Sequence, residues 1–303
     1  MTRPILVCMS WRGGVRFERC LTSIARALPH FDRVVLSITS APDSDDMRVA
    51  EAFRRQYPTV EILCTGRELP TMQHQAFWVS HLEATGAQPS DWVYWLAYDD
   101  EVRVRGIERL VDTEGNWPLR SDTVYFGPWA MRHEDPDRLW AGDPGAPLES
   151  WTSFQLDGPT RLPLLEWISD QLKQPTYMQM SGSVCPLRNF IDLRDGWPTK
   201  HGPMRIEMAV AASPGTRFVE EFGEPISIIY GRSNSDRATY GRQARREDRH
   251  LAARLARYCA RNPSAMPSLA VIVAEAAGQQ ARVRLHGAEF PTEEWRVRRT
   301  AFP

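Results

Sequence analysis

The feature that most constrains this chain is an apolar run that ends in three consecutive acids. Residues 92–98 are aromatic or aliphatic, and Asp99, Asp100 and Glu101 follow them directly. A continuous apolar run of this length is typical of a strand that is buried on both faces of a parallel sheet. Because adjacent carboxylates repel one another, a turn that holds three of them is stabilised by a bound cation. The sequence therefore predicts a buried strand whose carboxyl end carries a divalent metal.

The spacing of the acids suggests which of them share the site. Residues i and i+2 of an extended segment point to the same side, so Asp99 and Glu101 would face the metal while Asp100 faces elsewhere. Carboxylate oxygens are the ligands that Mg²⁺ and Mn²⁺ prefer. An ordinary solvated acidic turn is the alternative, and the buried strand before the acids favours the metal.

Strands and helices alternate through the first hundred residues. Apolar runs predict strands at residues 4–10, 33–40, 59–64 and 91–97, and helical periodicity predicts helices at residues 16–28, 45–57 and 72–84. This alternation predicts an α/β fold with a mostly parallel, doubly wound sheet. Such sheets bind ligands in the crevice outside the carboxyl ends of their strands.

The middle of the chain is less regular. We expect strands at residues 122–126, 177–183 and 227–230, and short helices at residues 107–111, 190–193 and 205–212. Residues 127–163 are rich in Pro, Gly, Asp and Trp, and a loop of this length is usually functional or disordered. Its aromatic residues argue against disorder.

Composition excludes several classes of protein. The net charge of −1 gives no overall attraction to nucleic acid or membrane, and no apolar run is long enough to span a bilayer. The five cysteines are scattered without a CxxC pair, which indicates a reducing compartment. The amino terminus runs directly into a strand without a signal peptide, so we expect a cytoplasmic protein.

The character of the chain changes after residue 235. Residues 242–261 have a helical pattern, and residues 232–261 contain nine Arg against three acids. The helix is a solvated surface, a contact to a second subunit, or a patch for anionic lipid or nucleic acid. Its apolar residues favour packing against the main domain: Leu251, Leu255, Tyr258 and Cys259. We expect a C-terminal extension over residues 236–303, with a homodimer or peripheral membrane contact as options and no nucleic acid.

The layout resembles the metal-dependent glycosyltransferases of the GT-A fold, most closely the inverting family 2 enzymes. The segments that carry the resemblance are residues 5–12, 34–40, 98–101, 180–184 and 204–208. It implies a transferase domain over residues 1–235, with a nucleotide-binding half at 1–102 and an acceptor half at 103–235. It also implies Mn²⁺ or Mg²⁺ at the acids, a nucleoside-diphosphate sugar as donor, and a glycan, glycoconjugate or natural product as acceptor.

The resemblance also assigns individual roles. Glu207 would be the general base, with Asp192 and Asp195 as rivals and a surface ion pair as the alternative reading. Nucleotide contacts would come from Ser10, Trp11, Arg12, Ser40, Gln75 and Arg232. Acceptor contacts would come from Trp129, Ser181, Gly182 and His201.

The sequence departs from the family at one informative place. Family members usually carry an acid near the end of the second strand, where this chain has Thr39 and Ser40. Because of this departure, the sequence does not identify the base of the nucleotide. Two other functions are considered: a non-catalytic nucleotide- or polyanion-binding module, and a sugar-nucleotide pyrophosphorylase. The latter normally needs a Gly-x-Gly-x-Arg loop, which residues 11–14 do not match.

Overall fold

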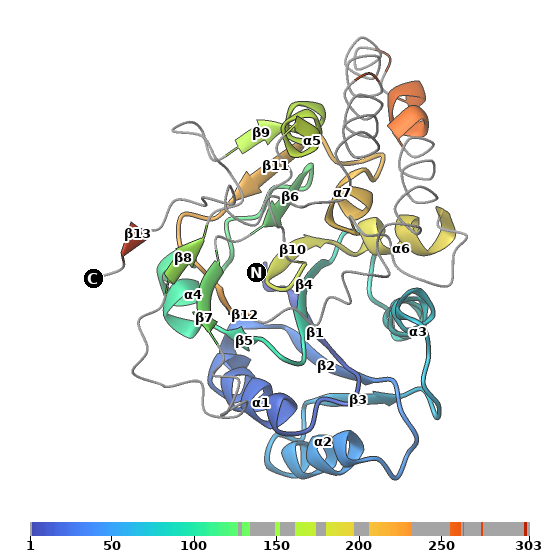
Figure 1. Cartoon of the computed structure of the whole chain (residues 1–303), viewed down its shortest axis with the longest axis vertical. Helices are drawn as coiled ribbons and strands as arrows, with labels where there is room; N and C mark the ends of the chain where they lie inside the picture. Colours follow the sequence, from blue (N-terminus) through green and yellow to red (C-terminus); the bar gives the residue numbers. More distant parts are fainter. Residues whose placement is uncertain are drawn as a thin grey trace, which may run out of the picture.

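The computed structural model describes residues 2–126, 129–133, 149–151, 161–173, 180–196, 206–231, 255–261, 263, 274 and 300–301. Its fold is mixed α/β and is organised around an eight-stranded sheet (Figure 1). The predicted α/β class is confirmed.

The amino half alternates strands and helices as the hydrophobic pattern predicts. Its elements are β1 (Ile5–Ser10), α1 (Val15–Ala27), η1 (Leu28–His30), β2 (Arg33–Ile38), α2 (Asp45–Gln56), β3 (Glu61–Cys64), α3 (Thr71–Ala84) and β4 (Trp92–Ala97). The predicted boundaries lie within two residues of these bounds. Ser44 caps α2 by accepting a hydrogen bond from the backbone nitrogen of Met47, which explains where that helix begins.

The second half supplies shorter elements. They are β5 (Glu101–Val102), α4 (Val104–Leu110), β6 (Thr123–Phe126), β7 (Trp129–His133), β8 (Glu149–Trp151), β9 (Arg161–Pro163), α5 (Leu164–Lys173), β10 (Ser183–Pro186), α6 (Leu187–Gly196), α7 (Ile206–Ala211), β11 (Phe218–Glu221), β12 (Ser227–Gly231) and β13 (Thr300–Ala301). The segments of residues 127–163 that the structure describes are therefore strands, where the sequence predicted a loop.

The main sheet has the order β3-β2-β1-β4-β10-β6-β11-β9. Strands β1 to β4 are parallel, whereas β10 runs antiparallel to both of its neighbours. A second sheet has the order β13-β8-β7-β12-β5. We expected a strand at residues 177–183, but β10 begins at Ser183, after a turn at Gly182, whose φ of 83° is disfavoured for other residues.

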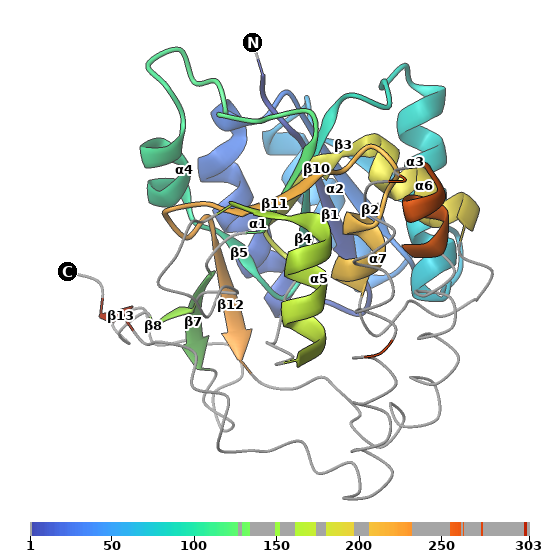
Figure 2. The same ribbon diagram turned by 90° about the horizontal axis from the view of Figure 1, so that it is seen from above.

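Alternate residues of the central strands face two separate cores. Ile5, Val7 and Met9 of β1 pack on the side of α3 and α6, and Leu6 and Cys8 pack on the side of α1 and α2. Figure 2 shows the same arrangement from above, with helices on both faces of the sheet. Both faces are therefore buried, which accounts for the unbroken apolar runs in the sequence.

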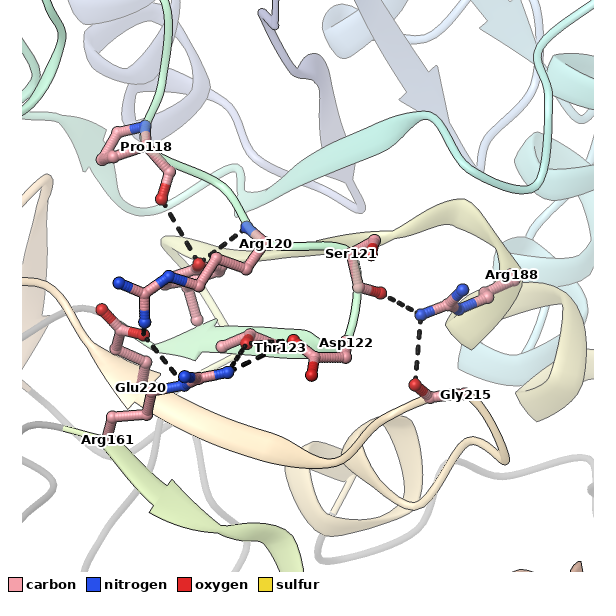
Figure 3. Close-up of polar contacts among 10 residues, drawn as sticks. Pro118, Arg120, Ser121, Asp122, Thr123, Arg161, Arg188, Gly215 and Glu220 are labelled. Atoms are coloured by element: carbon pink, nitrogen blue, oxygen red, sulfur yellow. Dashed lines mark hydrogen bonds and ion pairs between the residues drawn. The ribbon is translucent and has the colours of Figure 1, made fainter.

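Charged side chains join the strands at the β9 edge of the main sheet, where β6, β11 and β9 lie side by side. Arg161 of β9 donates to Asp122 and Thr123, each at 3.3 Å, and lies 3.6 Å from Glu220 of β11 (Figure 3). Arg188 of α6 donates to the carbonyls of Ser121 and Gly215 in the same view. These contacts fix the loop before β6, away from the acids that follow β4.

The predicted C-terminal helix is described over residues 255–261. Leu255, Tyr258 and Cys259 are buried in the core that also contains residues of α5 and α6. This burial agrees with the predicted packing against the main domain, while residues 242–254 lie outside the described part. Within the described part, no helix combines the length and the hydropathy that a membrane crossing requires.

Candidate functional site

The three acids lie at the carboxyl end of β4, beside the end of β1. The backbone nitrogen of Tyr98 donates to the carbonyl of Met9 at 3.1 Å, so β4 stays beside β1 up to this residue. Residues 98–100 then form a turn, in which the nitrogen of Asp100 donates to the carbonyl of Ala97 at 3.2 Å. The segment is not extended, so the i, i+2 argument that placed Asp99 and Glu101 together does not apply here.

The environments of the three acids differ. Asp100 is buried, with 4% exposure. The pKa of the Tyr94 phenol is raised well above its usual value, first by burial and second by the negative charge of Asp100. Glu101 begins β5 and forms an ion pair with Arg19 of α1 at 3.3 Å between Nε and Oε1. Arg19 also donates to the carbonyl of Asp99 at 2.7 Å. Asp99 itself is half-buried.

The acidic turn fits one kind of metal site better than another. Among the described residues no group of three His, Cys, Asp or Glu side chains converges as a metal cage. Mg²⁺ is commonly bound by one or two carboxylates together with the phosphates of a substrate. A metal held in this way would use the half-buried Asp99, since Asp100 is buried and Glu101 pairs with Arg19.

The loop after β1 encloses a carboxylate that the sequence analysis missed. Asp46, in the first turn of α2, has 3% exposure and accepts hydrogen bonds from Ser10 Oγ at 2.6 Å, Gly13 N at 2.9 Å and Gly14 N at 3.0 Å. Ser10 is fully buried, so in this structure it positions the loop and offers no surface to a nucleotide. The first-turn acid after the Ser44 cap was the signal available in the sequence.

The outer part of the same loop is exposed. Trp11 has 49% exposure, and the guanidinium of Arg12 lies 5.5 Å from the centre of its ring. Arg12 Nε donates to Glu68 Oε1 at 2.8 Å, which joins this loop to the loop after β3. Both residues predicted for nucleotide contact are therefore accessible, and Glu68 is a neighbour that the sequence did not reveal.

The residues at the end of β2 are engaged by the protein itself. Thr39 Oγ1 accepts from the nitrogen of Leu69 at 2.6 Å, and Ser40 Oγ lies 2.7 Å from Ser44 Oγ. Both residues are buried. Ser40, predicted as a nucleotide contact, instead stabilises the start of α2 in this structure.

Helix α3 carries two buried polar side chains near the same edge. His74 lies 2.8 Å from Ser37 Oγ, and burial lowers the pKa of His74 to about 4. Gln75 has 1% exposure, and its amide nitrogen has no hydrogen-bond partner among the described residues. Gln75, predicted as a nucleotide contact, is therefore not accessible to a ligand in this structure.

The predicted acceptor residues fall into two groups. Ser181 accepts a hydrogen bond from the nitrogen of Ala97 at 3.1 Å, and a side chain at Gly182 would meet Ser227 Oγ at 2.3 Å. Both positions therefore hold the turn beside the end of β4. Trp129 lies in β7, but its side chain, together with His201 and Arg232, is outside the described part of the structure.

The proposed base and its rivals are partly described. Glu207 lies in α7, followed by the buried residues Met208, Ala209 and Val210, and its side chain is not among those described. Asp192 accepts a hydrogen bond from Ser213 Oγ, and Asp195 pairs with Arg194 at 2.7 Å. The Asp195 side chain is 61% exposed, so it is a surface group in this structure.

A separate hollow lies at the opposite edge of the sheet. It has a volume of about 460 Å³ and is lined by residues at the amino ends of the strands, among them Arg3, Arg33 and Trp92. The acids after β4 lie at the other end of that strand. This hollow is therefore not part of the candidate site.

Comparison with known proteins defines the fold class. No protein-family model and no curated protein matches the chain. Among solved structures, Staphylococcus aureus TarS 1–349 in complex with UDP has a TM-score of 0.51 at 10% identity, and the match covers 94% of this chain and 73% of that one. The chain has the fold of the GT-A nucleotide-sugar transferases, as the resemblance in its sequence implied.

Two further solved structures are more distant. The mannosyltransferase PcManGT of Pyrobaculum calidifontis, in complex with GDP-Man and Mn²⁺, has a TM-score of 0.46 at 12% identity, and the match covers 94% of this chain and 76% of that one. A 4-diphosphocytidyl-2C-methyl-D-erythritol synthase has a TM-score of 0.40 at 14% identity, covering 83% of this chain and 100% of that one.

Proposed function

We propose that this chain is a metal-dependent, inverting glycosyltransferase that takes its sugar from a nucleoside diphosphate. The observation that carries the proposal is the acidic turn at residues 98–101, which follows the buried strand β4 at the carboxyl edge of a GT-A sheet. Ligands of open α/β sheets bind outside this edge. The acceptor is a hydroxyl of a glycan, glycoconjugate or natural product.

Each acid has a distinct part in this proposal. Asp99 holds the metal, and a bound Mg²⁺ or Mn²⁺ supplies positive charge that stabilises the departing diphosphate. Glu101 and Arg19 hold the turn in place through their ion pair and through the bond from Arg19 to the carbonyl of Asp99. Asp100 is enclosed beside Tyr94 and adds negative charge behind the turn.

Glu207 is proposed as the general base. It stands at the start of α7, whose following residues are buried and apolar. A carboxylate in apolar surroundings gains basicity, which suits removal of a proton from an acceptor hydroxyl. The variant Glu207→Gln keeps the size of the side chain and removes the base, so turnover falls while donor binding is retained.

The test is donor turnover by the purified full chain. UDP- and GDP-linked sugars are incubated with the protein and Mn²⁺, and release of nucleoside diphosphate is measured. Asp99→Ala is expected to lower turnover by at least about a hundredfold, because it removes a metal ligand. The matched control is Glu108→Gln, an exposed acid on α4. Unchanged turnover in Asp99→Ala would show that the turn does not bind a metal needed for turnover.

A non-catalytic nucleotide-binding module is the second candidate. The observation in its favour is the Arg19–Glu101 ion pair, because this guanidinium offsets part of the acidic charge without a metal. A module of this kind binds nucleoside diphosphate without releasing it from a donor. Donor binding without turnover, for every sugar nucleotide tested and with acceptors present, would favour the module.

A further inference from the structure

Two loops meet across the carboxyl end of β2. In the sheet, β2 lies between β1 and β3, and all three strands run in the same direction. Arg12 follows β1 and Glu68 follows β3, and their side chains bond to each other at 2.8 Å. With 70% of the Arg12 side chain and 49% of the Glu68 side chain exposed, the contact lies on the surface.

Trp11 completes this contact. Hydrogen bonds from the side chains of Arg12 and Trp11 hold the pKa of Glu68 below its usual value, so the carboxylate is charged at neutral pH. The Arg12 guanidinium also lies beside the Trp11 ring, 5.5 Å from its centre. We refer to Trp11, Arg12 and Glu68 as the loop bridge.

The stability of the fold does not explain the loop bridge. An ion pair with this exposure contributes little to folding. Arg12 has a φ of 52°, a left-handed conformation that no other residue except glycine adopts in the described part of the chain. Such conformations cost energy and cluster where a ligand is bound. Asp46 holds the loop from below through Ser10, Gly13 and Gly14, which keeps Arg12 in this conformation.

The chemistry of the loop bridge matches one part of a nucleotide. An exposed indole offers a flat face on which a base can stack. A carboxylate accepts hydrogen bonds from N–H or O–H groups and repels phosphate. Thr39 and Ser40, at the end of β2 beneath the bridge, are bonded to Leu69 and Ser44. A nucleoside has a base that can stack on Trp11 and N–H or O–H groups that can donate to Glu68, so it matches the loop bridge better than a diphosphate does.

We propose that Glu68 determines nucleoside specificity: it accepts hydrogen bonds from the base or the ribose of the donor, while Trp11 stacks on the base. This inference rests on the proposed function and places the nucleoside over β2, with the diphosphate directed toward the acids after β4. Glu68→Gln tests it, because the amide keeps the size of the side chain but loses its charge and one acceptor oxygen.

The experiment is calorimetric titration of the full chain with UDP, GDP and inorganic pyrophosphate in the presence of Mn²⁺. For the nucleoside diphosphate that the wild type binds, Glu68→Gln is expected to weaken binding about tenfold. Trp11→Ala is expected to weaken it at least about tenfold, and Trp11→Phe to restore most of the affinity. Pyrophosphate binding should stay unchanged. Glu51→Gln is the control, since Glu51 is an acid on α2 that pairs with Arg54 at 2.7 Å.

The 2′,3′-dideoxy form of the same nucleoside diphosphate, which has neither ribose hydroxyl, identifies the atoms that Glu68 contacts. If the loss in Glu68→Gln disappears with this ligand, Glu68 binds the ribose hydroxyls; if the loss persists, Glu68 binds the base. Wild-type affinity for the nucleoside diphosphate in Glu68→Gln would overturn the inference and leave the proposed function standing. A wild-type chain that binds no nucleoside diphosphate would overturn both.

Discussion

Two turns at the same edge of the sheet hold their carboxylates by different means. At the turn after β1, Asp46 of α2 is enclosed and accepts from three neutral donors of the turn, with distances of 2.6 to 3.0 Å. After β4, Glu101 pairs with a charged partner, Arg19, at 3.3 Å, and both side chains have 17% exposure. Neutral donors can satisfy the lone pairs of one buried acid, so Asp46 has a structural role. The second turn places three acids at the carboxyl end of β4, where we propose that a cation binds.

The largest effect is expected where the enclosed acid is removed. Asp46→Ala leaves Ser10, Gly13 and Gly14 without their acceptor, and buried donors without partners cost about 1–3 kcal/mol each. We expect the free energy of unfolding to fall by about 3 kcal/mol or more. Urea denaturation measures it, with Asp45→Ala, the exposed neighbour in the same helical turn, as control. A loss below that of the control would show that Asp46 is not structural.

The free energy of unfolding should also depend on pH through His74, which lies beside Ser37 of β2. The folded state binds this proton only near pH 4, whereas an unfolded imidazole binds it near pH 6.5. The unfolded state therefore holds more protons between these values, so stability is complete above pH 6.5 and falls as the pH decreases toward 4. The loss from this residue is about 3 kcal/mol.

Denaturation at several pH values measures the contribution of His74. The variant His74→Asn removes the titration, so its stability should vary less between pH 6.5 and 4 than that of the wild type. Equal slopes for the two proteins over this range would show that His74 does not remain neutral in the folded state.

Gly13→Ala tests how tightly the first turn is packed. A Cβ atom at this position would lie 2.7 Å from Phe17 Cβ, 2.9 Å from Tyr98 Cδ2 and 3.0 Å from Ser10 Oγ. Overpacking of this kind costs about 1–3 kcal/mol. Thermal denaturation measures the loss, and Gly223→Ala, where a Cβ would meet no atom within 4 Å, is the control. Equal melting temperatures for the two variants would contradict the described packing.

The smallest effect on stability is expected at the acidic turn itself. Glu101→Gln removes a half-buried ion pair, and we expect a loss of about 1 kcal/mol. The same variant should retain metal-dependent turnover, because Glu101 is assigned to hold Arg19 and not the metal. A large loss of turnover at unchanged stability would show that Glu101, and not Asp99, is the acid that holds the metal.

The sequence predicted the amino half well because its signals are local. Both faces of β1 and β4 are buried, so continuous apolar runs identified them, and helical periodicity identified α2. The antiparallel β10 was misplaced because its position depends on the close approach of Gly182 to Ser227, a contact between distant segments. The second sheet was missed for a similar reason, since the paired residues Trp129 of β7 and Ser227 of β12 are 98 positions apart in the sequence.

The candidate site was predicted only in outline. The acids after β4 were found because they interrupt an apolar run, but their division of roles depends on Arg19, which lies 80 residues earlier than Asp99. Asp46 and Glu68 were missed because single acids in helix starts and loops resemble ordinary surface residues. Their partners come from the loop after β1, and only the fold brings these segments together.

The central claim is that the acidic turn binds a nucleoside diphosphate through a metal. Calorimetric titration of the full chain with UDP and GDP, in Mn²⁺ and in EDTA, tests it most directly. We expect binding in Mn²⁺ that is lost in EDTA, and that is lost in Mn²⁺ when Asp99 is changed to Asn. Binding of the same strength in EDTA, or in Asp99→Asn, would contradict it.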